Sequence, residues 1–153
     1  MFRPSLSVIV ATGLGVGFVP VAPGTAGSLA AAIVALPILA FAGTPWLAVA
    51  IVVVVAVGIP AADRAAREMG DSDPGAVVID EVAGQWIALL PAAPDFLSFA
   101  VAFAAFRLFD IAKPGPVGWA DRRLKGGIGI MADDLIAGAF AAAIVWAVRT
   151  ALS

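Results

Sequence analysis

Four long apolar stretches constrain this chain more than any other feature of its sequence. They cover residues 28–42, 46–62, 96–112 and 135–152, and each is close to the roughly 20 residues that cross a bilayer as a helix. Hydrophobic residues make up 62% of the chain and charged residues only 13%, which is more apolar surface than a soluble domain of 153 residues can bury. The sequence therefore predicts an all-α fold: a polytopic membrane bundle of about five to six helices that forms a single domain over residues 1–153.

The distribution of basic residues predicts how the bundle is oriented. Short segments at residues 43–45 and 91–95 contain proline and no Lys or Arg, and we expect them to be turns. The loops expected at residues 63–73 and 113–126 carry most of the Lys and Arg residues. The positive-inside rule places these two loops in the cytoplasm and the two turns outside. Whether the apolar run at residues 6–19 also crosses the membrane is left open.

Residue types that are missing exclude several kinds of chemistry. The chain has no cysteine and no histidine, so it has no disulfide, thiolate nucleophile or imidazole ligand. Any catalysis must depend on Asp, Glu, Lys, Arg, Ser or Thr. The net charge of −2 and the absence of a continuous basic patch argue against a nucleic-acid partner.

Threading the predicted spans brings acidic residues from distant parts of the chain to one membrane face. These five carboxylates belong to Asp80, Glu81, Asp110, Asp133 and Asp134. Together they would repel one another unless cations shared the site, and oxygen-only ligands favour Mg²⁺. The competing interpretation is that the acids only form ion pairs at helix ends. One of Asp133 and Asp134, but not both, is expected to cap the last helix. Residues 76–90, which contain Asp80 and Glu81, are expected to be less regular than a membrane helix.

Two glycine-containing segments are candidates for binding phosphate. Residues 23–28 place glycines and hydroxyl groups just before a helix, where free backbone N–H groups accept a phosphate; an ordinary turn capped by Thr25 or Ser28 is the alternative. Residues 126–129 are expected to form a second such loop rather than only a flexible approach to the last helix. We also expect Asp73 to cap the helix that follows Pro74.

Helical spacing and aromatic residues lead to two further expectations. The spacing of Arg107, Asp110 and Lys113 puts a carboxylate between two cations on one helix face. The four tryptophans are interpreted as interfacial anchors without a catalytic role: Trp46, Trp86, Trp119 and Trp146.

Four sequence blocks, in this order, resemble the phosphatidylglycerophosphatase A family of bacterial lipid phosphatases. They are residues 17–28 (GFVPVAPGTAGS), Asp73-Pro74 with residues 80–84 (DEVAG), residues 106–114 (FRLFDIAKP), and residues 126–134 (GGIGIMADD) with Ala137-Gly138. The resemblance implies an all-helical, Mg²⁺-dependent enzyme of the bacterial cytoplasmic (inner) membrane. Its expected reaction removes the terminal phosphate from phosphatidylglycerol phosphate, with the active site facing the cytoplasm. Gln85 and the small middle residue of Pro114-Gly115-Pro116 depart from the expected pattern.

Combining the residues with the resemblance gives a predicted site. Metal ligands are expected among Asp80, Glu81, Asp110, Asp133 and Asp134, and the catalytic residues are expected to be Asp80, Asp110, Lys113 and Asp134. Phosphate or substrate contacts are expected from Thr25, Gly27, Ser28, Arg107, Lys113 and Gly127. Attack by water and attack by an aspartate both remain open.

Two functions from other classes are weighed against the phosphatase. A small transporter or channel subunit would use buried carboxylates to pass protons or cations, and it predicts acids distributed through the depth of the membrane. A non-catalytic lipid-binding or assembly protein would tolerate loss of Asp110.

Overall fold

The computed structural model describes residues 4–153, and every regular element in that range is helical. The elements are α1 (Leu6–Ala11), the 3₁₀ turn η1 (Val16–Phe18), α2 (Pro23–Pro37), the π-helical turn η2 (Ile38–Ala42), α3 (Thr44–Met69), α4 (Ile79–Leu89), α5 (Phe96–Ala112), α6 (Pro116–Arg123) and α7 (Gly126–Leu152). The predicted all-α class is confirmed. The seven α-helices in this range exceed the expected five to six, and one of them, α6, forms where a loop was predicted. α1 lies in the apolar run at residues 6–19 that the sequence left open.

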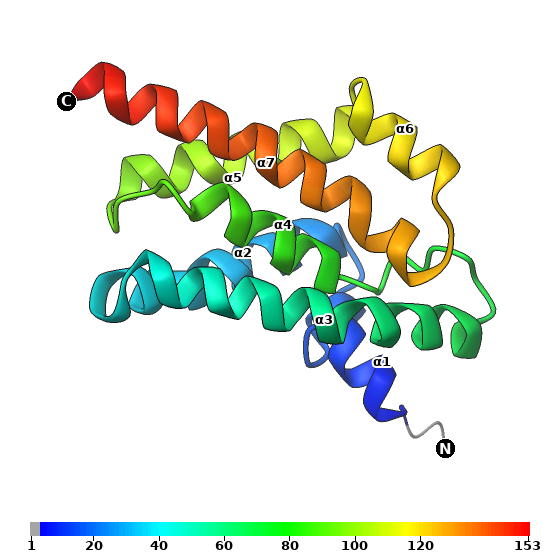
Figure 1. The fold of residues 1–153 in the computed structure, drawn as a ribbon. Coiled ribbons are helices and arrows are strands. Elements are labelled where there is room, and N and C mark those ends of the chain that lie inside the picture. Colours follow the sequence, from blue (N-terminus) through cyan, green and yellow to red (C-terminus); the bar gives the residue numbers. More distant parts are fainter. Residues whose placement is uncertain (1–3) are drawn as a thin grey trace.

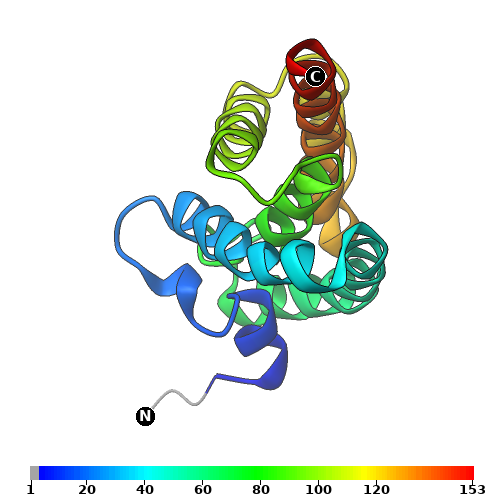
Figure 2. The same ribbon diagram turned by 90° about the vertical axis from the view of Figure 1, so that its left-hand side faces the viewer.

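The long helices run roughly antiparallel around one short helix (Figures 1 and 2). α4 lies at the centre and contacts α2, α3, α5 and α7. Residues 76–90 were expected to be irregular, and this expectation was wrong for α4. The helix forms because its apolar faces pack against four neighbours, so that almost the whole of α4 is buried.

Close approach between α4 and α7 depends on glycine. A Cβ atom added to Gly138 would collide with the carbonyl group of Gly84, and a Cβ at Gly84 would collide with Phe106 and with the carbonyl of Asp134. The backbones of α4 and α7 therefore touch, as in membrane bundles whose helix contacts use small residues.

Three helices are long and apolar enough to cross a membrane: α2 continued by η2, α3 and α7. Large apolar side chains on these helices are turned outward, including Phe41 at 91% exposure and Val52 at 68%. An outward apolar surface of this extent is what lipid contact requires. The predicted span at residues 96–112 is helix α5, with the predicted bounds, although it is shorter than the other three.

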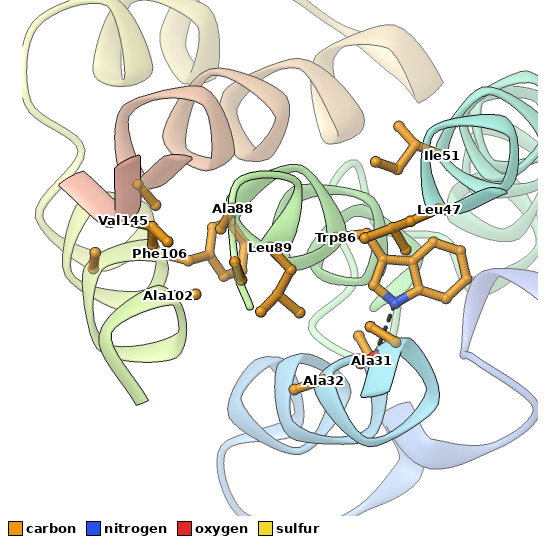
Figure 3. Packing of buried hydrophobic residues seen from close by; sticks show 14 of the residues in the cluster. Ala31, Ala32, Leu47, Ile51, Trp86, Ala88, Leu89, Ala102, Phe106 and Val145 are labelled. Carbon is orange, nitrogen blue, oxygen red and sulfur yellow. Dashed lines mark hydrogen bonds between the residues drawn. The ribbon is translucent and has the colours of Figure 1, made fainter. Parts of the chain in front are cut away.

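The core is built around the aromatic residues of α4 and α5 (Figure 3). Trp86 is buried between α2 and α3, and its indole Nε1 donates a 2.8 Å hydrogen bond to the carbonyl oxygen of Ala31. Its prediction as an interfacial anchor was wrong, because an indole can also face inward when a backbone carbonyl accepts its N–H. Trp46, Trp119 and Trp146 are exposed on the surface, as an interfacial position requires.

The connections between helices differ in part from expectation. Gly43 (φ 90°) makes the predicted turn before α3, and Asp95 in the second predicted turn accepts a hydrogen bond from the Ser98 backbone N–H to cap α5. The expected loop at residues 113–126 instead contains α6. The N-cap of α4 is Val78 without a side-chain cap, so the prediction that Asp73 caps this helix was wrong.

Candidate active site

The five predicted carboxylates meet at one end of the bundle, the right-hand end in Figure 1. The first turn of α4 supplies Asp80 and Glu81, the end of α5 supplies Asp110, and α7 supplies Asp133 and Asp134 about two turns after its start. The capping interpretation was wrong for both α7 acids, because the N-cap of α7 is Lys125.

Two overlapping groups of three carboxylates have the geometry to hold a cation. Asp80, Glu81 and Asp134 form one group, and Asp110, Asp133 and Asp134 form the other. In each group, one oxygen per residue lies within 4.8 Å of the others. Asp134 belongs to both groups and is only 2% exposed.

Several carboxylate oxygens in this cluster are buried without a protein partner. Within residues 4–153, Asp80 Oδ1, Glu81 Oε2 and Asp134 Oδ2 accept no hydrogen bond. Unpaired acceptors of a buried carboxylate carry a large desolvation cost, and a hard cation would satisfy them. The residues present therefore fit a bound metal ion.

Lys113 is the cation in direct contact with Asp133 of α7. It ends α5 in a left-handed conformation (φ 48°), and its Nζ donates hydrogen bonds to Asp133 Oδ2 at 2.5 Å and to Asp121 Oδ1 at 2.7 Å. Burial lowers the pKa of Lys113, but the two carboxylate hydrogen bonds outweigh it and raise the pKa above its ordinary value. Lys113 therefore keeps its positive charge at neutral pH. The predicted single face of Arg107, Asp110 and Lys113 is only partly realised, because Lys113 turns to α6 and α7 rather than to Asp110.

Arg107 lies between α2 and two of the acids, Asp110 and Glu81. Its guanidinium forms an ion pair with Asp110 and lies 4.0 Å from Glu81 Oε1. A Cβ on Gly24 would collide with that Glu81 oxygen and would come within 3.3 Å of the Arg107 guanidinium. Gly24 therefore gives these two side chains their space.

The segment at residues 23–28 is the first part of α2 rather than a loop before it. The N-cap is Ala22, so the alternative in which Thr25 or Ser28 caps the helix was wrong. Ser28 Oγ donates to the carbonyl oxygen of Gly24 at 2.9 Å, and Gly27 packs against the side chain of Val78.

Residues 126–129 likewise form the first turn of α7 rather than a phosphate loop. The Gly127 backbone N–H donates to Asp63 Oδ1 at 3.2 Å, and Gly127 leaves no room for a side chain beside the Ile59 carbonyl. Asp63 thus joins the start of α7 to the end of α3.

A cavity of about 530 Å³ opens beside the carboxylate cluster. Predicted site residues that line it are Asp80, Glu81, Asp110, Lys113, Asp133 and Asp134, whereas Thr25, Gly27, Ser28, Arg107 and Gly127 do not. The cavity is also lined by polar residues that were not predicted as site residues, among them Asp63, Arg67, Asp71, Ser72, Asp73, Asp121 and Lys125.

Two of these additional residues, Asp73 and Asp121, bear most on the predicted site. Burial raises the pKa of Asp73 above its usual range. Asp121 holds Lys113, as described above. The sequence carried one signal for Asp73, its position in a block that resembles the family, but it carried none for Asp121, whose role depends on the fold of α6.

Comparisons with known proteins match most of this chain. The family model described as phosphatidylglycerophosphatase A matches residues 9–149. The Escherichia coli (strain K12) phosphatidylglycerophosphatase A is 40% identical, with 90% of this chain and 80% of that protein covered. The Haemophilus influenzae protein of the same name is 37% identical, with 92% and 87% covered. A Bacteroides thetaiotaomicron protein, provisionally named a phosphatidylinositol-3-phosphatase, is 42% identical, with 97% and 98% covered.

No solved structure gives a significant match to this chain. The family match extends from α1 to the last turns of α7, so it includes every helix that contributes to the cavity. This chain belongs to the phosphatidylglycerophosphatase A family.

Proposed function

We propose that this membrane protein is a lipid phosphatase that hydrolyses phosphatidylglycerol phosphate to phosphatidylglycerol and inorganic phosphate in phospholipid biosynthesis. The observation that carries the proposal is a cavity lined by carboxylates from α4, α5 and α7, with a charged lysine beside them. Within residues 4–153, some buried oxygens of these carboxylates have no hydrogen-bond partner. Family membership supplies the reaction class. A transporter predicts acids spread through the membrane depth, whereas these acids gather at one end.

Mg²⁺ is the proposed cofactor, and the two carboxylate groups described above would hold one or two ions. Oxygen-only donors of this kind suit Mg²⁺ better than softer metals. When bound, Mg²⁺ would polarise the phosphate oxygens and lower the pKa of a water molecule for in-line attack.

The protein side chains have separate proposed tasks around the phosphate. Asp80, Asp110 and Asp134 hold and orient the reacting groups in the cavity, and Lys113 stabilises the charge that develops on the phosphate oxygens. The oxygen of water forms a bond to phosphorus as the bond between phosphorus and the glycerol oxygen breaks. The water gives up one proton, and the departing glycerol oxygen takes up one proton to become the hydroxyl group of phosphatidylglycerol. If an aspartate attacked first, a labelled phosphoenzyme would be trapped; with water as the nucleophile it would not.

The predicted phosphate-binding residues outside the cavity take a different proposed role. Arg107 balances the charge of Asp110 and Glu81, and Gly24 in the first turn of α2 packs against both Arg107 and Glu81. Thr25, Gly27 and Ser28 would support this side of the cluster through the fold of α2. Gly127 allows α7 to approach α3 closely.

We further propose that the cavity opens to the cytoplasm at the bacterial inner membrane. Arg64 and Arg67 lie near the end of α3, and the Lys and Arg residues of the segment from Lys113 to Lys125 lie at the same end of the bundle as the acids. The positive-inside rule then assigns this end to the cytoplasm.

The first test measures phosphate release by the purified protein in detergent, with Mg²⁺ or with a chelator. We expect Mg²⁺-dependent release that Asp110→Asn abolishes. Asp95→Asn is the matched control, because Asp95 lies at the opposite end of α5 and asparagine can still cap a helix. A folded preparation that releases no phosphate with any divalent metal would contradict the proposal.

The headgroup is tested in the same assay by comparing phosphatidylglycerol phosphate with phosphatidylinositol 3-phosphate, since the relatives carry names for both kinds of lipid. We expect the kcat/KM for phosphatidylglycerol phosphate to be higher than that for phosphatidylinositol 3-phosphate. The reverse order would assign the other headgroup to this chain and leave the phosphatase reaction standing.

A further inference from the structure

Helix α6 has two distinct faces. Val117, Gly118 and Ala120 are buried against the bundle, and Asp121 on the same side holds Lys113. Trp119 is 54% exposed, and Arg122 and Arg123 are also exposed. We call these last three residues the outer surface of α6; they play no part in the proposed reaction.

The outer surface is continuous because of its helical spacing. Residues 119, 122 and 123 are separated by three and four positions, which places them side by side on one face. Within residues 4–153, neither Arg122 nor Arg123 forms an ion pair, although the acids nearby pair with Lys113, Arg107 and Arg67. The two guanidinium groups are therefore available to an external anion.

The position of α6 matches the border between lipid and water. Five residues before α6, Ile111 at the end of α5 is 69% exposed, and five residues after α6, Ile128 in the first turn of α7 is 59% exposed. Outward apolar residues thus reach the level at which α6 begins and ends, while Lys113 and Lys125 flank the helix in sequence. Trp beside Arg is the composition that membrane interfaces favour, since the ring packs at headgroup level and the cation meets lipid phosphates.

We propose that the outer surface of α6 binds the headgroups of anionic phospholipids in the membrane that holds the protein. These lipids are ligands rather than substrates, so the inference goes beyond the proposed reaction. Charge complementarity selects the occupant: two free guanidinium groups beside an exposed indole fit an anionic lipid surface, whereas a docking protein would need a larger apolar patch than a single Trp.

The binding surface and the proposed active site share one short helix. Asp121 on the inner side of α6 contacts the lysine of the cavity, Trp119 and Arg123 lie on the exposed side of the same helix, and the Arg122 guanidinium lies beside Gly118 between the two sides. A headgroup bound to Arg122 and Arg123 would therefore hold in place the helix that orients Lys113.

The test uses the full-length protein in phosphatidylcholine vesicles that contain a small fraction of nitroxide-labelled lipid. The nitroxide label is placed near the headgroup of either phosphatidylserine or phosphatidylcholine. The fluorescence of Trp119 is obtained by subtracting the signal of the Trp119→Phe variant from that of the unmodified protein. We expect labelled phosphatidylserine to quench Trp119 several-fold more than labelled phosphatidylcholine at low salt. The preference should fall at high salt and disappear in an Arg122→Gln, Arg123→Gln double variant.

Internal controls make the result decisive. Trp46 and Trp146 lie on α3 and α7 toward the opposite end of the bundle, so the residual signal in Trp119→Phe should not change with the double substitution. Equal quenching by the two lipids in the unmodified protein would overturn the proposal. Quenching of Trp119 by aqueous acrylamide but by neither lipid would also overturn it, because the surface would then face water or a soluble partner. None of these readings depends on phosphatase activity.

Discussion

Lys113 Nζ lies 2.5 Å from Asp133 Oδ2, and this contact joins the end of α5 to the second turn of α7. The two residues are twenty positions apart, with α6 between them. The same ammonium group also contacts Asp121 of α6. One lysine that lines the cavity therefore links three helices, at the place where we propose that the phosphate binds.

Replacing Lys113 tests its proposed role toward the phosphate. We expect Lys113→Ala to lower kcat by about 10²–10³-fold, the range observed when one preorganised donor to a developing oxyanion is lost. Arg64→Ala is the control, because Arg64 is an exposed cation near the same end. Similar losses in both variants would indicate a general effect of surface charge.

The raised pKa of Lys113 predicts how the stability of the protein depends on pH. Because the folded pKa of Lys113 is raised, its stabilising contacts are fully present below the ordinary lysine pKa of about 10.4 and are lost only as pH rises through the higher folded value. Thermal unfolding of the wild type and Lys113→Met in detergent should therefore differ by a constant amount between neutral and mildly alkaline pH. A difference that vanished between pH 7 and 9 would contradict a raised pKa.

Asp121 is predicted to position Lys113 without touching the phosphate. Asp121→Asn should lower kcat by about 10-fold, the smaller end of the range seen when a residue that orients a ligand is lost. Asp121→Glu keeps the carboxylate and should therefore lose less activity than Asp121→Asn. KM should change little. A large increase in KM with unchanged kcat would show instead that Asp121 contacts the headgroup.

The first turn of α2 should be sensitive to a single added methyl group. Gly24→Ala would displace Glu81 and Arg107, so we expect a strong loss of phosphate release while far-UV circular dichroism keeps its helical signal. Shortening the displaced acid in a Gly24→Ala, Glu81→Asp double variant should recover some activity. If Gly24→Ala were fully active, the close approach of Gly24 to Glu81 and Arg107 would not matter for activity.

Metal binding should be visible as a change in stability. Without metal, Asp134→Asn should raise the unfolding temperature, because it removes a buried charge that faces other acids. With Mg²⁺ at about 100 times its dissociation constant, the wild type should gain about 2.7 kcal/mol, and the variant should gain much less. Asp95→Asn, at the far end of α5, should respond to Mg²⁺ as the wild type does.

The contact between α4 and α7 is predicted to be intolerant of larger side chains. Gly138→Ala should destabilise the protein by about 1–3 kcal/mol, because its methyl group would meet the Gly84 carbonyl. Ala143→Val on the exposed side of α7 serves as the comparison and should change stability by roughly 0.5 kcal/mol or less. Unfolding in detergent followed by circular dichroism measures both.

Much of the site was predictable because charge is rare in this sequence. Apolar runs determined where the long helices form, with α5 predicted at its observed bounds. The prediction that Asp80, Asp110 and Asp134 lie at one membrane face then followed from the direction of each span. Which of the two cations at the end of α5 lines the cavity was not predictable, since only their positions and partners in the fold distinguish Lys113 from Arg107.

By itself, the sequence determined the helical class, the membrane character and the five acids that gather at one end of the bundle, because apolar length and isolated charges are local properties of the chain. Tertiary structure alone decided that α4 lies inside the bundle, that Trp86 faces the core and that Asp121 reaches Lys113. The physical reason is that lipid and protein interior are equally apolar. An apolar face in the sequence therefore does not reveal whether it will meet lipid or another helix, and that choice is made only when the helices pack.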